Sequence, residues 1–244
     1  MKELSVIDFF CGAGGFSEGF RQMGFKIEKG YDNWKPAIET YNHNFGTKSK
    51  IKNILDFHNS IEDINELPNT DIILGSPPCV SFSSSNKSGK ADKSLGLKLT
   101  ESFLRVVAVK KHQKNSNLKA WFMENVVNSR KYLQAEYTFE DLNLTEWAKL
   151  NNLNPKSIAI KLGENTAIIN AADYGSLQAR KRVVSGEIIK ENKLVIPEPS
   201  HKDPKKEGQL PNYRTIGEMK SRFPSPYSRL SNKIIAEPQF DIDL

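Results

Sequence analysis

The sequence predicts an α/β fold in which helices cover the strands of an open sheet. The apolar run Ile72–Leu74, which follows Asp71, is typical of a buried strand, and Gly75-Ser76-Pro77-Pro78 ends it abruptly. Residues 4–24 show the order strand, glycine-rich turn and helix. Ligands of such sheets bind at the carboxyl ends of the strands, and Cys79 comes immediately after the four residues that end this predicted strand. Cys79 is therefore a candidate nucleophile.

Composition sets the bounds of this prediction. The 244 residues suffice for one full α/β domain, and 26% charged with 38% hydrophobic residues is ordinary for a globular protein. We find no secretory signal or membrane-spanning run, so we expect a soluble intracellular protein in which Cys11 and Cys79 are free thiols. The Cys and His residues do not have zinc spacing. The net charge of +6 suggests a polyanionic partner.

The first elements form a candidate nucleotide-binding unit. A strand over residues 4–10 leads into a glycine-rich turn at 11–15, whose backbone N–H groups can approach a ligand. Asp32 follows a strand over 25–31 and is placed to bind ribose hydroxyls. The dinucleotide fingerprint needs glycine where Ser17 stands, which disfavours a nicotinamide cofactor. A tight turn without any ligand remains the alternative.

The middle of the chain adds further helices and strands. We predict a helix over 34–45, a short strand over 51–55, a helix over 97–112 and a strand over 120–123. Glu124 lies at the end of the last of these strands, where an unpaired carboxylate is costly. It therefore has either a structural hydrogen-bond partner or a role in proton transfer. The polar segment after Cys79 carries Lys87, Lys90 and Lys93, and it is either a loop that lies on phosphates or a solvated linker.

In the last part of the chain we predict a helix over 138–151 with Thr138 as its N-cap. Strands are predicted over 158–162, 166–170 and 183–189. Arg180 and Arg182 point the same way if their segment is extended, giving two donors for phosphate or a base carbonyl; a solvated basic turn is the alternative. Residues 191–244 are interpreted as a linker or extension, helical only over 215–223.

Four short motifs now stand in a recognisable order. They are Asp8–Gly15, Pro77-Pro78-Cys79, Glu124-Asn125-Val126 and Gln178–Arg182, and together they resemble the DNA (cytosine-5)-methyltransferase family over about the first four-fifths of the chain. The resemblance implies a Rossmann-like, S-adenosylmethionine-dependent fold with a mostly parallel, seven-stranded sheet and helices on both faces. It implies a catalytic domain at 1–190 and an extension at 191–244.

The resemblance also implies roles for individual residues. Cys79 would add to C6 of a flipped-out cytosine in duplex DNA, and Glu124, with a raised pKa, would share a proton with N3. Arg182 would contact the base near O2 and Arg180 would support the site. The implied cofactor is S-adenosylmethionine, with S-adenosylhomocysteine as product and no metal; its expected contacts are Phe10, Gly12, Ala13, Gly14, Gly15, Asp32, Asn33, Trp34, Asn53, Ile54, Ser76 and Pro78. The expected DNA contacts are Ser83, Lys87, Lys90, Lys93 and Gln178.

The sequence also departs from the family pattern. Val80 replaces a usual glutamine and Leu177 a usual proline, and neither change removes a catalytic group. The target-recognition domain and the Gly-Asn-Ser-Val segment are absent. We therefore expect the catalytic half of a split, cytoplasmic enzyme of a bacterial or archaeal restriction-modification system, inactive without a second subunit that carries those parts. A fragment, an inactive binding or regulatory subunit, and an RNA cytosine methyltransferase are the alternatives.

Overall fold

The computed structural model describes residues 3–78 and 93–219 of the chain. The chain divides into two compact units, and each is described by itself. The first comprises residues 1–169 and 181–197, and the second comprises residues 170–180 and 198–244. Within the described ranges no helix has the length and apolarity needed to cross a membrane.

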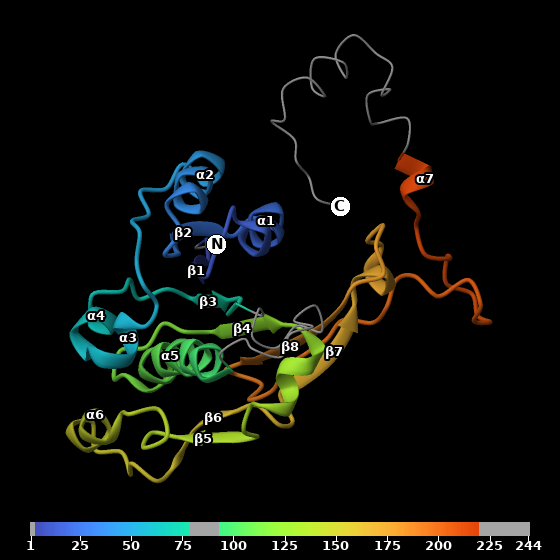
Figure 1. The fold of residues 1–244 in the computed structure, drawn as a ribbon. Coiled ribbons are helices and arrows are strands. Elements are labelled where there is room, and N and C mark those ends of the chain that lie inside the picture. Colours follow the sequence, from blue (N-terminus) through green and yellow to red (C-terminus); the bar gives the residue numbers. More distant parts are fainter. Residues whose placement is uncertain (1–2, 79–92, 220–244) are drawn as a thin grey trace. The chain divides into compact units, whose positions relative to one another are not determined.

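The main sheet has six strands in the described residues, in the order β2-β1-β3-β4-β8-β7 (Figure 1). Their bounds are β1 (Ser5–Phe9), β2 (Lys26–Tyr31), β3 (Ile72–Gly75), β4 (Ala120–Asn125), β7 (Thr166–Asn170) and β8 (Lys181–Ile188). The pairs β1–β2, β1–β3 and β3–β4 are parallel, whereas β8 runs antiparallel to β4. The predicted α/β fold with a mostly parallel sheet is thus confirmed, and the part of the chain that the structure describes supplies six strands of this sheet, where seven were expected.

Helices cover both faces of this sheet, and β1 shows why (Figure 1). Its side chains alternate between two apolar faces, as the two-residue period of a strand requires. Val6 packs on the face covered by α1 (Gly15–Gln22), which lies on the same side as α2 (Lys35–Phe45). Ile7 and Phe9 pack on the opposite face, against the helices α3 (Asp56–Asn59), α4 (Ile61–Asn65) and α5 (Lys93–His112).

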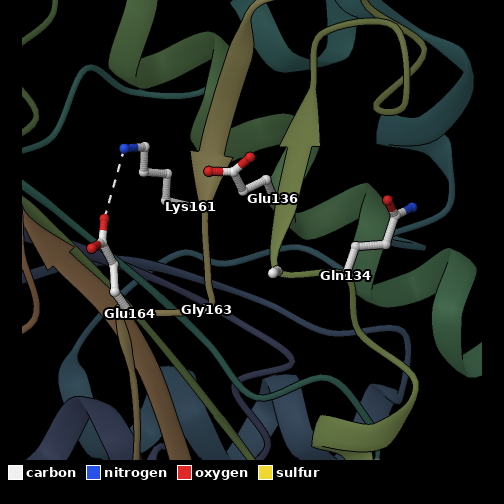
Figure 2. A pocket seen from close by; sticks show the side chains of 6 residues that line it. Gln134, Glu136, Lys161, Gly163 and Glu164 are labelled. Atoms are coloured by element: carbon white, nitrogen blue, oxygen red, sulfur yellow. Dashed lines mark ion pairs between the residues drawn. The ribbon is translucent and has the colours of Figure 1, made fainter.

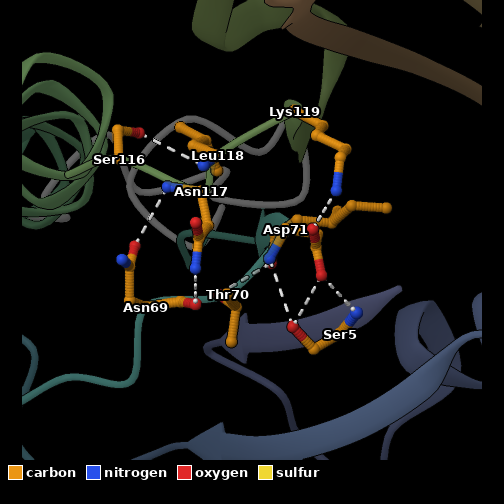
Figure 3. Close-up of polar contacts among 9 residues, drawn as sticks. Ser5, Asn69, Thr70, Asp71, Ser116, Asn117, Leu118 and Lys119 are labelled. Carbon is orange, nitrogen blue, oxygen red and sulfur yellow. Dashed lines mark hydrogen bonds and ion pairs between the residues drawn. The ribbon is translucent and has the colours of Figure 1, made fainter. Parts of the chain in front are cut away.

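A buried carboxylate fastens the amino ends of three strands together (Figure 3). Asp71 Oδ2 accepts hydrogen bonds of 3.0 Å from both the backbone N–H and the hydroxyl of Ser5. Lys119 forms an ion pair with the other carboxylate oxygen. Burial alone raises the pKa of Asp71, but the bonds from Lys119 and Ser5 outweigh it and leave that pKa lowered. The contacts therefore stabilise the sheet at the edge away from the strand ends that carry the motifs.

The strand predicted over residues 51–55 is wrong. Ile51 forms only an isolated bridge with Asp32, and its side chain is exposed. The side-chain oxygen of Asn53 accepts a hydrogen bond from the N–H of Leu55 at 3.1 Å, which closes a turn where a strand would have continued. The chain then enters the short helices α3 and α4.

The single helix predicted over residues 138–151 is also wrong. The segment forms β5 (Glu136–Thr138), a turn and then α6 (Thr145–Leu150). The Thr138 hydroxyl donates to the Asp141 carboxylate at 2.7 Å and accepts from the Asp141 N–H at 3.1 Å, so it caps the turn and not a helix. Strand β5 pairs with β6 (Ile158–Lys161) in a separate two-stranded sheet. The remaining short helices are η1 (Val127–Lys131), η2 (Ala171–Tyr174) and α7 (Ile216–Met219).

Candidate active site at the carboxyl ends of the strands

Parallel strands bring the first motifs to one edge of the sheet. Strand register places Phe9 beside Gly75 and Gly75 beside Met123. Beyond the strands, Ser76 donates its N–H to the Phe9 carbonyl and its hydroxyl to the Phe10 carbonyl, each at 3.1 Å. The glycine-rich turn and the chain leading to Cys79 are therefore tied together at their starting points.

The antiparallel pairing of β4 and β8 brings two predicted catalytic side chains into contact. Asn125 lies opposite Val183, so the end of β4 meets the beginning of β8. Arg182 Nε lies 2.7 Å from Glu124 Oε1, and both side chains are largely covered. A charge-assisted bond of this length fixes the carboxylate and leaves its second oxygen for a substrate. The two residues were assigned to different contacts on the same base, and the structure places them side by side.

Cys79 lies outside the described residues, but the structure does show what anchors the chain just before it. Asn125 donates its side-chain amide to the buried Pro77 carbonyl at 3.3 Å. Its side-chain oxygen also accepts the N–H of Val126 at 2.8 Å. Asn125 thus links the strand that carries Glu124 to the segment that leads to Cys79. Asn125 is recognisable in the sequence only as the middle residue of the Glu124-Asn125-Val126 motif, and no local pattern predicts its bond to Pro77.

Cys11, the other cysteine, is the first residue of the glycine-rich turn, and its buried side chain packs with Ile38 and Tyr41. Burial raises the pKa of its thiol strongly, and the nearby Asp8 and Asp32 charges raise it further. A thiol in this setting stays protonated at neutral pH and is a poor nucleophile. Cys11 therefore has a packing role in the turn.

The glycine-rich turn adopts the conformations that its glycines permit. Gly12 and Gly14 have φ of 52° and 100°, and Phe10 also has a positive φ of 56°, which is uncommon for a bulky residue and typical of functional turns. A Cβ added to Gly12 would meet nothing within 4 Å, so the turn faces open space there. Asp32 accepts hydrogen bonds from the N–H groups of Gly12 at 3.0 Å and Trp34 at 2.9 Å. The open turn and its acidic neighbour fit a nucleoside-type cofactor.

The other predicted cofactor contacts differ in what they can offer. The Trp34 side chain is 65% exposed and can stack on a ring, and Asn33 is also exposed. Ala13 uses its carbonyl to accept a bond from the side chain of Asn44 at 2.9 Å. The Ile54 side chain is buried in the core, which leaves its backbone for a ligand. Of the remaining residues, Pro78 and Gly15 are exposed and Asn53 closes the turn described above.

A buried polar cluster beneath the turn was not predicted. Ser17 donates its hydroxyl to Asp8 Oδ2 at 2.7 Å and lies 2.8 Å from the Tyr41 hydroxyl. Asp8 is fully buried, and its second oxygen has no hydrogen-bond partner. Burial raises the pKa of Asp8 to about 7, Ser17 opposes this rise, and the charge of Asp32 adds to it. Ser17, which stands where the dinucleotide fingerprint needs glycine, therefore links its own helix α1 to β1 through Asp8 and to α2 through Tyr41.

The remaining predicted residues lie elsewhere or outside the described ranges. Gln178 and Arg180 belong to the second unit and are exposed. Lys93 begins α5, and its side chain is among the parts of the chain that are not described. Ser83, Lys87 and Lys90 also lie outside the described residues. Within residues 3–78 and 93–219 no group of three or more His, Cys, Asp or Glu is placed to hold a metal ion.

A hollow of about 570 Å³ beside β5 and β6 is distinct from this site (Figure 2). Its lining residues are Gln134, Ala135, Glu136, Lys161, Gly163 and Glu164. Lys161 is paired with Glu164 at 3.7 Å, and Glu136 adds a second carboxylate. Because DNA binding depends on cationic side chains, this acidic lining is unsuited to phosphates.

The fold and the strand-end site together define a Rossmann-like methyltransferase. The chain belongs to the C-5 cytosine-specific DNA methylase family, whose model matches residues 4–240. This match extends beyond the four-fifths expected from the motifs and includes most of the presumed extension.

Several proteins are similar to this chain. It is 33% identical over 242 residues to the type II methyltransferase M.HindV of Haemophilus influenzae, covering 96% of this chain and 71% of the relative. It is 38% identical over 129 residues to M.HgiGI of Herpetosiphon aurantiacus, covering 52% of this chain and 94% of that protein. It is 31% identical to M1.HphI of Haemophilus parahaemolyticus, covering 91% of this chain and 53% of the relative.

One crystal structure supports the fold. A protein described as a DNA modification methyltransferase encoded within an E. coli prophage superposes with a TM-score of 0.55 at 23% identity. The match covers 88% of this chain and 53% of that one, so the present chain spans about half the length of the solved structure.

Proposed function

We propose that this chain transfers a methyl group from S-adenosylmethionine to C5 of cytosine in duplex DNA through a covalent adduct with Cys79. The contact between Arg182 and Glu124 at 2.7 Å carries the proposal. It holds a carboxylate at the carboxyl end of β4, next to the strand β3 from which the chain continues to Cys79. The family to which the chain belongs supplies the reaction class.

The residues divide the chemistry between them. The Cys79 thiolate forms a bond to C6, and the electron pair of the C5–C6 double bond becomes available at C5 as Glu124 shares a proton with N3. When bound beside the base, S-adenosylmethionine would supply the methyl group from its sulfonium centre, leaving S-adenosylhomocysteine. Loss of the C5 proton to a base then expels the Cys79 thiolate and restores the ring. Arg182 orients Glu124 during these steps and can reach toward the base carbonyl.

The base must leave the helix for this chemistry, since C6 cannot be approached within a stacked duplex. We propose that Phe10, the turn at Gly12 and Gly14, and Asp32 hold the cofactor on the neighbouring side. The open face of Gly12 and the exposed Trp34 ring support this assignment.

The test is trapping of the adduct. Duplex DNA in which 5-fluorocytosine replaces cytosine is incubated with S-adenosylmethionine, because fluorine at C5 cannot leave as a proton does and the adduct persists. With the second subunit also present, we expect a denaturant-resistant complex whose mass spectrum locates the DNA on Cys79. Cys79→Ala should abolish it, whereas Cys11→Ala, the matched control, should retain it.

The same assay tests the remaining parts of the proposal. Methyl incorporation into tRNA but not duplex DNA would indicate an RNA methyltransferase. The proposed second subunit is tested by adding the product of the neighbouring reading frame: adduct formation by the isolated chain at full rate would refute the need for it. Absence of any adduct with all components present would refute the assignment of Cys79.

A further inference from the structure

The second unit contains the loop that precedes Arg182 in sequence and carries Gln178 and Arg180. The N–H of Ala171 donates to the Arg180 carbonyl at 3.0 Å and so closes the base of this loop. Gln178 and Arg180 are exposed, and neither belongs to a strand or helix. Such a loop needs other contacts to hold its side chains ready for a ligand.

Those contacts come from residues 198–214, which we call the clasp. The backbone N–H groups of Ser200 and His201 both donate to the Asp173 carbonyl at 2.9 Å. The Tyr213 hydroxyl donates to Asp173 Oδ1 at 2.5 Å and accepts from the Asn170 side chain at 3.3 Å. The Ser200 hydroxyl also donates to the Asp173 carbonyl at 3.4 Å, so this one loop residue accepts four hydrogen bonds from a segment 27 to 40 positions away in sequence.

The clasp has its own internal order. Lys202 donates its N–H to the Pro211 carbonyl and accepts the Tyr213 N–H, each at 2.9 Å. The Lys202 ammonium group also binds the side-chain oxygen of Asn212 at 2.9 Å. These bonds join the two ends of residues 202–213 and fix the position from which Tyr213 reaches Asp173.

The loop also accommodates the clasp sterically. Gly175 has φ of 84°, a conformation that glycine adopts without strain. A Cβ added there would lie 3.0 Å from the His201 ring. The hydroxyl of Ser200 lies 2.9 Å from His201 Nδ1 and orients that ring. The loop and the clasp are therefore matched in shape as well as in hydrogen bonding.

We propose that the clasp positions the 171–180 loop for contact with DNA, with Tyr213 as the positioning residue. The inference rests on the proposed function, which gives Gln178 and Arg180 their DNA. Ordering a loop during binding costs conformational entropy, and a loop that is already ordered avoids this cost. The clasp thereby turns the presumed linker into a part of the DNA-binding apparatus.

Tyr213→Phe is the informative variant because it removes only the hydroxyl. We expect the amides of Gly175 and Ser176 to exchange hydrogen about three- to tenfold faster, with exchange in β1 and α1 unchanged. The KM for duplex DNA should rise about three- to tenfold, while kcat and the affinity for S-adenosylmethionine change less than about twofold. Gln209→Ala, an exposed neutral change within the clasp, is the matched control and should behave as wild type.

A second variant, together with the wild type, distinguishes failure of the positioning role from failure of the proposed methyltransferase function. Asp173→Ala should also speed amide exchange and raise the KM for DNA. The double variant should be no worse than Tyr213→Phe, because both changes remove the bond between Tyr213 and Asp173 and Tyr213→Phe already removes the bond from Asn170. Unchanged amide exchange or an unchanged KM for DNA in both single variants would overturn the positioning role. If the wild type forms no cytosine adduct, the proposed function fails. Faster amide exchange in Tyr213→Phe would then still support ordering of the loop by the clasp. Unchanged amide exchange in this variant would refute that ordering.

Discussion

Replacing Asp8 with asparagine should remove a large pH dependence of stability. Asp8 is fully buried, and its pKa is raised from an ordinary 3.8 to about 7. A carboxyl group whose pKa is raised by folding stabilises the folded state most below its unfolded pKa, and the contribution is lost as the pH rises through the folded value. The two pKa values differ by about 3, which corresponds to about 4 kcal/mol in total.

Most of this loss falls within an accessible pH range. Between pH 5 and pH 8 the linkage relation gives a loss of about 2–3 kcal/mol from Asp8. Asp8→Asn cannot ionise, and its side-chain oxygen can still accept the hydrogen bond that Ser17 now donates to Asp8. The variant should therefore lack this component, and every other titrating group should contribute equally to both proteins.

The assay is urea unfolding of both proteins at intervals from pH 5 to pH 8. The free energy of unfolding of the wild type should fall relative to that of Asp8→Asn by about 2–3 kcal/mol as the pH rises. A difference that stays constant within about 0.5 kcal/mol would show that Asp8 ionises in the folded protein as it does in the unfolded chain, and the reasoning from burial would be refuted.

Three further predictions concern other polar contacts. Ser17→Gly completes a dinucleotide fingerprint, yet it should bind no nicotinamide cofactor in calorimetry and should lose about 2–4 kcal/mol in urea unfolding, because Asp8 loses its donor. Asp71→Asn should lower the melting temperature at pH 7 by several degrees, and this difference should shrink as the pH falls below 3.8, since the stabilisation from a lowered pKa is complete above the ordinary value and is lost as the folded carboxylate takes up its proton. Arg182→Met should reduce methyl incorporation about 100-fold or more without changing the circular dichroism spectrum, as Glu124 loses its ion pair.

The sequence predicted those parts of the fold that depend on local patterns. Strands such as Ser5–Phe9 and Ala120–Asn125 are apolar runs with clear ends, and their order is enough to indicate an α/β sheet. The helix over 138–151 failed because Thr138 followed by acidic residues resembles a helix start. The same residues satisfy a turn when Tyr137 pairs with Ile160, and that pairing depends on a partner far along the chain.

The candidate site shows the same division. The motifs identified Glu124 and Arg182 as candidate site residues. Their direct contact follows from the antiparallel register of β4 and β8, which no local pattern specifies. The buried cluster around Asp8 was not predicted, because a single acidic residue in an apolar strand has no local signature. Its partners Ser17 and Tyr41 come from two helices that only the fold brings to it. Tyr213 lay in a segment interpreted as a linker, and its partner Asp173 is 40 positions away.

The reversal of direction between β4 and β8 has a consequence for how such proteins can diversify. Glu124 and Arg182 are registered by hydrogen bonding between two adjacent strands, so neither depends on a loop for its place. Connecting segments at this end of the two strands can therefore lengthen, shorten or be exchanged while the contact between Glu124 and Arg182 stays intact.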